Sequence, residues 1–189
     1  WGPKLPVENY EKLAKTLFCY DNPPGTKIIS GSQDSIGIVF PGLAKAYYEG
    51  QYWPSSIKHV RDESLLHFVE NSLYLISLGP RYSSYDVLAD TRFSRDLARA
   101  LAEAADHCWD SILRRDVVDF GRALRASFEA QVAMFPHMMN DRIAELIDAY
   151  RNQAFGWKLS GAGGGGYLIL VSDKPIPEAT RVLARREVD

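Results

Sequence analysis

Apolar residues recur along the chain with two spacings, and each spacing predicts a different kind of secondary structure. A spacing of three or four residues, as in Tyr10, Leu13, Ala14 and Leu17, predicts an amphipathic helix over residues 7–18. The same spacing predicts helices over residues 90–124, 123–135 and 141–154, the last capped at Asn140 and Asp141, and a short helix over 177–186.

Aromatic and β-branched residues gather in shorter runs, which predict strands. These runs cover residues 42–49, 51–60, 72–78, 157–159 and 167–171, and the first two form a hairpin around Glu49 and Gly50. Because the strands come in hairpins with helices grouped between them, the expected fold class is α+β, with two layers and a mostly antiparallel sheet packed on helices.

The composition of the chain excludes several classes of function. The chain has 189 residues, 46% of them hydrophobic, which predicts a folded, well-cored protein. Its 22 Lys and Arg against 24 Asp and Glu give a net charge of −2, so we expect neither a nucleic acid nor a membrane as partner. Cys19 and Cys108 lie far apart, and no apolar run resembles an export or membrane segment. We therefore expect reduced thiols and a cytoplasmic protein.

A glycine-rich segment separates the last two expected strands; it reads Ser160, Gly161, Ala162, Gly163, Gly164, Gly165, Gly166. It does not fit a dinucleotide fingerprint, because a strand rather than a helix follows it. It does not fit a phosphate loop either, because Tyr167 and Leu168 stand where Lys and Ser or Thr would be. Four consecutive glycines exceed what a turn needs, so exposed backbone amides that bind an anion, most often phosphate, are the favoured interpretation. A purely structural turn is the alternative.

A second glycine-flanked segment places Gln33 and Asp34 between Gly31 and Gly37. Taken alone, Asp34 is typical of a turn or a helix cap. The functional alternative is a carboxylate that accepts a proton from a substrate hydroxyl. The presence of a candidate phosphate segment elsewhere in the chain strengthens that alternative.

Together these segments resemble the GHMP small-molecule kinases, and within them the sugar-kinase branch of L-fucokinases and D-glycero-D-manno-heptose 7-phosphate kinases. Residues 159–168 resemble the third family motif, and residues 31–37 resemble the Gly-x-Gln-Asp-Gln-x-Gly segment with the catalytic aspartate, although Ser35 replaces the second Gln. Residues 75–81 resemble the Thr-Gly-x-x-Arg segment, with Leu78 in place of Thr and a shorter spacing to Arg81. Pro41 and Gly42 bring the chain closer to the fucokinases.

The resemblance implies the C-terminal part of an ATP-dependent sugar kinase that phosphorylates a sugar hydroxyl, fucose-like and at the anomeric position. The alternatives are a heptose-phosphate kinase of the same family, or a non-catalytic remnant that binds a sugar or sugar phosphate. The first and second family motifs are absent from this sequence. We therefore expect ATP and Mg²⁺ to be bound mainly by a missing N-terminal part, no metal ligands in this chain, and no activity of the chain alone.

Family roles transfer residue by residue to this sequence. Asp34 would be catalytic; Gly31, Gln33 and Arg81 would bind the sugar, although a surface salt bridge is the alternative for Arg81. The phosphate or nucleotide side would comprise Ser160, Gly161, Ala162, Gly163, Gly164, Gly165 and Gly166. Residues 1–60 would end the N-terminal kinase domain and residues 61–189 would form the C-terminal domain. The expected partners are a sugar, ATP and the missing N-terminal domain.

Overall fold

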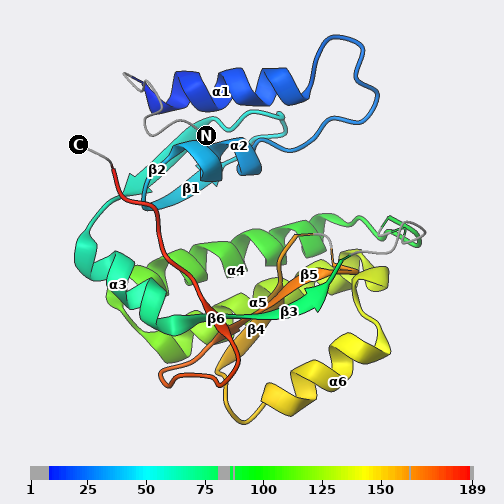
Figure 1. Cartoon of the computed structure of the whole chain (residues 1–189). Coiled ribbons are helices and arrows are strands. Elements are labelled where there is room, and N and C mark those ends of the chain that lie inside the picture. The colour runs from blue at the N-terminus through cyan, green and yellow to red at the C-terminus, as the bar shows by residue number, and fades with distance from the viewer. Residues whose placement is uncertain (1–8, 81–85, 87, 162, 188–189) are drawn as a thin grey trace. The chain divides into compact units, whose positions relative to one another are not determined.

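The computed structural model describes residues 9–80, 86, 88–161 and 163–187 (Figure 1). The chain forms two compact units, Trp1–Leu66 with Ala184–Asp189, and His67–Leu183. The assignment of residues 1–60 and 61–189 to two kinase domains stays a prediction. Within the described residues, no helix combines the length and the apolar character needed to cross a membrane.

The N-terminal unit begins with helix α1 (Tyr10–Asp21), which Asn9 caps by accepting the Lys12 N–H at 2.9 Å. A short helix α2 (Gln33–Val39) follows, and then an antiparallel hairpin of β1 (Leu43–Tyr47) and β2 (Ser56–Val60). The apolar stripe of α1 packs on α2 and the hairpin. The buried centre of this cluster consists of Ala14, Ile36 and Val39.

The C-terminal residues belong to the same unit. The Gly42 N–H donates to the carbonyl oxygen of Arg185 at 2.8 Å, and Glu187 accepts hydrogen bonds from Tyr10 and Arg61. The last described residues are therefore held against α1 and the hairpin, so this unit is built from both ends of the chain.

The second unit contains a four-stranded sheet in the order β4-β5-β3-β6, in which every neighbouring pair is antiparallel. Helix α3 (Glu63–Ser72) spans the boundary between the units and leads directly into the first strand. The strands are β3 (Leu73–Gly79), β4 (Gly156–Leu159), β5 (Gly166–Val171) and β6 (Thr180–Arg181). The helices are α4 (Arg95–Arg114), α5 (Val117–Met134), the 3-10 turn η1 (Pro136–Met138) and α6 (Asp141–Tyr150).

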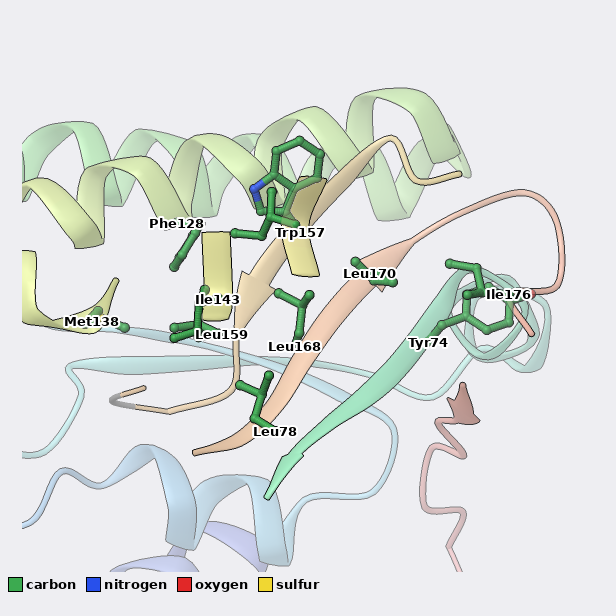
Figure 2. Close-up of a cluster of buried hydrophobic side chains, with 11 residues drawn as sticks. Tyr74, Leu78, Phe128, Met138, Ile143, Trp157, Leu159, Leu168, Leu170 and Ile176 are labelled. Carbon is green, nitrogen blue, oxygen red and sulfur yellow. The ribbon is translucent and has the colours of Figure 1, made fainter. Parts of the chain in front are cut away.

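The core of this unit gathers apolar side chains from the sheet, α5, η1 and α6. Figure 2 shows them grouped along the strands; the buried members are Tyr74, Leu78, Phe128, Met138, Ile143, Ile147, Trp157, Leu159, Leu168, Leu170 and Ile176. Helices α4 and α5 run side by side (Figure 1), and α5 approaches β4 closely through Gly121 and Gly156. A Cβ atom at Gly156 would overlap the backbone of Gly121, so this contact requires glycine.

The expected α+β class with antiparallel strands is confirmed, but two predicted helices are wrong. No helix forms over residues 177–186; Thr180 and Arg181 instead pair with β3 as β6. The edge of β3 offers unpaired backbone groups, and Arg181 further donates to the Glu70 carbonyl oxygen at 3.2 Å. Tertiary pairing therefore overrides the local helix preference.

The predicted helix over residues 90–124 is also wrong, because two helices occupy this region. Arg115 has a φ of 58°, in the left-handed region, and ends α4. Asp116 then caps α5 by accepting the N–H groups of Val118 and Asp119. Apolar spacing continues through the break because α4 and α5 pack against each other, so periodicity alone did not reveal the break.

Helices α2 and α3 were not predicted. The strands of the first hairpin are shorter than predicted, and residues 48–55 connect them rather than a tight turn. The predicted cap at Asn140 is confirmed, since its side chain accepts the Ile143 N–H at 2.9 Å.

Candidate functional site

The first candidate segment forms the start of α2 in the N-terminal unit. Ser32 is completely buried, and its hydroxyl donates to the carbonyl oxygen of Tyr52 at 2.8 Å. Because a hydroxyl has one proton, the Tyr48 hydroxyl must donate to the Ser32 Oγ, also at 2.8 Å. This anchoring from the hairpin side fixes the first turn of α2, and the next two side chains, Gln33 and Asp34, are exposed.

The side chain of Gln33 occupies the space next to Gly31. A Cβ atom at Gly31 would collide with the Gln33 side-chain amide, which lies back over the glycine. Any larger residue at position 31 would therefore displace Gln33. Three of the predicted site residues, Gly31, Gln33 and Asp34, thus form one local arrangement at the start of α2.

The second candidate segment is the glycine loop, which we define as residues 160–166, in the C-terminal unit. It connects β4 to β5, whose pairing ends with the Ser160 N–H donating to the Tyr167 carbonyl oxygen at 2.9 Å. Positive φ angles occur at Gly161 (71°), Gly163 (79°), Gly164 (73°) and Gly166 (85°). Side chains rarely adopt this backbone conformation, so the fold itself demands glycine at these positions.

Crowding adds to this demand at one position. A Cβ atom at Gly163 would lie 3.1 Å from the Leu159 Cδ1 and 3.3 Å from the Met138 carbonyl oxygen. At Gly161, by contrast, an added Cβ atom would meet nothing within 4 Å. The loop is therefore packed on η1 at its middle and open to solvent at its beginning, where Ser160 and Gly161 are exposed.

A cavity of about 70 Å³ borders the glycine loop. It lies between the end of β3, the start of α6 and the loop, and its lining residues are Leu78, Pro80, Asn140, Arg142, Ile143, Gly164 and Gly165. Arg142 contributes the one charged side chain among the described residues that line it.

Lys158 lies two residues before the loop, on β4. Its Nζ donates to the Gln131 Oε1 at 2.6 Å and to the Ser127 Oγ at 3.0 Å, both on α5. Burial disfavours the ammonium and lowers the pKa of Lys158 from 10.5 to about 8, while the nearby Cys108 acts in the opposite direction. Lys158 thus ties the strand that carries the loop to α5.

The remaining predicted site residues, Arg81 and Ala162, lie outside the described residues. The Asp34 segment and the glycine loop belong to different units. Within the described part of the chain, no group of three His, Cys, Asp or Glu side chains is arranged to hold a metal ion. Cys19 and Cys108 are free thiols, the first exposed and the second partly buried.

Sequence reasoning missed two charged residues beside the glycine loop, Lys158 and Arg142. A signal existed for each. Lys158 alternates with the apolar residues Trp157 and Leu159 in a strand, and Arg142 places a cation in the first turn of a helix, where acidic residues are preferred.

Comparisons with known proteins place this architecture in context. Residues 108–187 match the family described as GHMP kinases C terminal. The L-fucokinase/L-fucose-1-P guanylyltransferase of Bacteroides fragilis is 28% identical over 155 residues, which are 77% of this chain and 16% of that protein. The bifunctional fucokinase/GDP-fucose pyrophosphorylase of Arabidopsis thaliana is 26% identical over 179 residues, covering 88% of this chain and 17% of that protein.

A solved structure shares the fold. The D-glycero-D-manno-heptose 1-phosphate kinase of Bacteroides thetaiotaomicron superposes with a TM-score of 0.58 at 15% identity, over 89% of this chain and 46% of the other. At this identity the likeness concerns the fold alone. The chain spans about a sixth of the length of the two relatives above.

Proposed function

We propose that this chain is the C-terminal part of an ATP-dependent sugar kinase, because residues 108–187 match the family described as GHMP kinases C terminal. The family resemblance predicted from the sequence is confirmed by this match and by the fucokinase relatives. We favour a fucose-like acceptor, phosphorylated at its anomeric hydroxyl. The observation that carries the proposal is the occurrence of the Gln33-Asp34 segment and the glycine loop, in the family order, in a chain similar to fucokinases.

Asp34 is the residue that we assign to proton transfer. Its exposed carboxylate on the first turn of α2 is free to accept the proton of an acceptor hydroxyl and to orient the oxygen for in-line attack. Gln33 and Gly31 lie beside it and would contact the sugar. Ser32, buried under this turn, holds the backbone so that the two exposed side chains keep their direction.

ATP, bound with Mg²⁺, supplies the phosphoryl group in such a reaction. The glycine loop fits the phosphate end of such a ligand, since its glycines carry no side chain that would block approach to the backbone. By family resemblance, we assign Mg²⁺ and most of the ATP contacts to a part of the protein outside this chain. The chain alone should therefore show no turnover.

The experiment that tests the role of Asp34 compares two isosteric variants of the protein that includes this chain and the residues preceding it. Asp34→Asn should lower the rate of ADP release with L-fucose by about 10²- to 10⁴-fold, because the amide cannot accept the proton. Asp21→Asn, a matched change at the exposed end of α1, should leave the rate unchanged. An undiminished rate in Asp34→Asn would show that this carboxylate is not the base.

The acceptor is tested separately. L-fucose, heptose 7-phosphate, galactose and arabinose are offered to the same protein, and ADP release is scored for each; NMR of the product then locates the phosphate. Fastest turnover with fucose, and phosphate on the anomeric oxygen, would support the favoured acceptor. Fastest turnover with the heptose phosphate would instead support the alternative kinase, and no turnover with any sugar would support a non-catalytic sugar-binding domain.

A further inference from the structure

The cavity beside the glycine loop is lined by a cation, the guanidinium of Arg142. Within the described part of the chain, Arg142 makes no hydrogen bond or ion pair. Other arginines of this unit do: Arg151 pairs with Asp148 at 3.2 Å on the same helix, and Arg125 pairs with Glu129 at 2.8 Å on α5. Arg142 thus differs from Arg151 on the same helix in having no partner among the described residues, and it differs from the other arginines of this unit in lining the cavity.

The position of Arg142 is also electrostatically unfavourable. It lies in the first turn of α6, where the positive end of the helix dipole disfavours a cation. Asn140 already caps this helix through the Ile143 N–H, so Arg142 is not needed there. A residue that conflicts with the local helix preference and makes no compensating structural contact is typical of a functional site.

The cavity has a definite size. A single ordered water needs about 10–15 Å³ of such space, whereas sites for whole cofactors start at about 300 Å³. At about 70 Å³, the cavity holds several water-sized groups, which suits one tetrahedral oxyanion with its oxygens and excludes a complete nucleotide. Leu78 and Ile143 supply apolar walls, and Gly164 and Gly165 present backbone without side chains.

We propose that Arg142 binds a phosphate group of a substrate or product in this cavity, with Gly164 and Gly165 allowing the phosphate to approach the loop backbone. A guanidinium offers paired N–H donors that match two phosphate oxygens. The binding of phosphate stands on the cavity and on Arg142; only the identity of the molecule that carries the phosphate rests on the proposed function. That molecule is either the nucleotide or a phosphorylated sugar.

Inorganic phosphate tests the site without any catalysis. The 189-residue chain is titrated with phosphate at constant ionic strength, and amide NMR signals are followed. Saturable shifts at Gly164 and Gly165 are expected, and Arg142→Gln should weaken the apparent affinity at least about ten-fold, since a lost charge-assisted contact is worth roughly 1.5–3 kcal/mol. Arg142→Lys, which keeps the charge and loses the paired geometry, should fall between the two.

Arg151→Gln is the matched control, because it removes an arginine from the same helix outside the cavity and should bind phosphate like the unaltered chain. Equal affinity of Arg142→Gln and the unaltered chain, or shifts that do not saturate, would overturn the proposal. Well-dispersed spectra of each variant establish that the fold is retained, and Arg142→Lys keeps the comparison informative should Arg142→Gln fail to fold.

The molecule that carries the phosphate is identified by kinetics of the protein that includes this chain and the residues preceding it. If the nucleotide supplies it, Arg142→Gln should raise the KM for ATP and leave the KM for the sugar unchanged. If a phosphorylated sugar supplies it, the KM for that sugar should rise and the KM for unphosphorylated sugars should not. Unchanged KM values for all of these ligands would contradict the role in the reaction. Should the protein prove not to be a kinase, the phosphate titration would still decide whether Arg142 forms an anion site.

Discussion

The two glycine-containing segments differ in why glycine is present. In the glycine loop, four glycines have positive φ angles, and Gly163 is packed against Leu159 and Met138. In the segment of residues 31–37, no positive φ occurs, and a Cβ atom added at Gly37 would meet nothing within 4 Å. The fold requires glycine in the loop, whereas the fold does not require Gly37.

This difference changes what each segment says about function. A glycine that the backbone demands would be present whether or not a ligand binds, so the loop alone is consistent with a structural turn. A glycine in a helix costs stability relative to alanine, and one in open space has no packing reason. Gly37 is therefore a position where a requirement of the fold and a requirement of a ligand can be told apart by substitution.

The two segments are also anchored differently. Ser32 fixes the start of α2 through neutral hydrogen bonds to Tyr48 and Tyr52. The strand before the glycine loop is fixed by Lys158, a partly buried amine whose partners Ser127 and Gln131 are neutral. Of these two anchors, Lys158 is the one with a pKa lowered to about 8. The stability of the unit that carries the glycine loop should therefore depend on pH through Lys158.

The largest expected effect comes from this lysine. The pKa of Lys158 is about 8 in the folded chain against 10.5 for an exposed lysine, so between these values the unfolded chain binds more protons. Stability should therefore rise with pH across this window and fall as pH decreases through 8, by up to about 3 kcal/mol. In Lys158→Met this part of the rise should disappear, as measured by urea unfolding from pH 7 to 10.5.

Lys174→Met is the control for this titration, because Lys174 is exposed and should leave the pH dependence unchanged. Comparison with the unaltered chain removes the contribution of the other groups that titrate in this range. An identical pH dependence in Lys158→Met and the unaltered chain would mean that the lysine is not desolvated.

Alanine in the glycine loop should have the next largest effect. Gly161→Ala introduces a side chain at positive φ in open space and should cost about 1–2 kcal/mol of unfolding free energy. Gly163→Ala has the same backbone cost and also presses on Leu159 and Met138, so it should lose more. Hydrogen exchange of β4 and β5 reports both losses; equal costs at the two positions would show that η1 yields to the added methyl group.

Sequence patterns were sufficient for the elements whose signals are local. The cap at Asn140, the hairpin order and the strands on both sides of the glycine loop follow from cap chemistry and strand composition. Helix α2 was missed because seven residues that include Gly37 have weak helix propensity, and packing of Ile36 and Val39 on α1 stabilises it. Residues 177–186 were misassigned because pairing with β3 is a long-range interaction.

The residues of the candidate site also fall into those that a sequence motif indicates and those that depend on tertiary packing. Asp34 and the glycine loop were proposed from motifs, because their residue types and order are visible in the sequence, and their roles stay predictions. The burial of Lys158 and the position of Arg142 at a cavity depend on how β4, α5 and α6 pack, which no local pattern specifies. The signals available beforehand were a basic residue in the first turn of a helix and a lysine that alternates with apolar residues in a strand.

The smallest effect on stability is expected at Gly37, and it has the opposite sign. Gly37→Ala fills open space in a helix and should stabilise α2 by about 0.5–1 kcal/mol, which hydrogen exchange of the N-terminal unit would detect. Gly37 lies three and four residues after Asp34 and Gln33, so all three share the exposed face of the helix. An added methyl group would protrude where the acceptor is proposed to lie.

Stability and acceptor binding should therefore move in opposite directions in this variant. The KM for the sugar should rise several-fold in the protein that includes the preceding residues, while the KM for ATP stays the same. Gly25→Ala does not serve as a control, because Gly25 has a φ of 92° and would add strain. Ala44→Ser, a small exposed change on β1, is the better comparison. A more stable Gly37→Ala protein with an unchanged KM for the sugar would mean that no ligand approaches this face, and the functional reading of residues 31–37 would then rest on Asp34 alone.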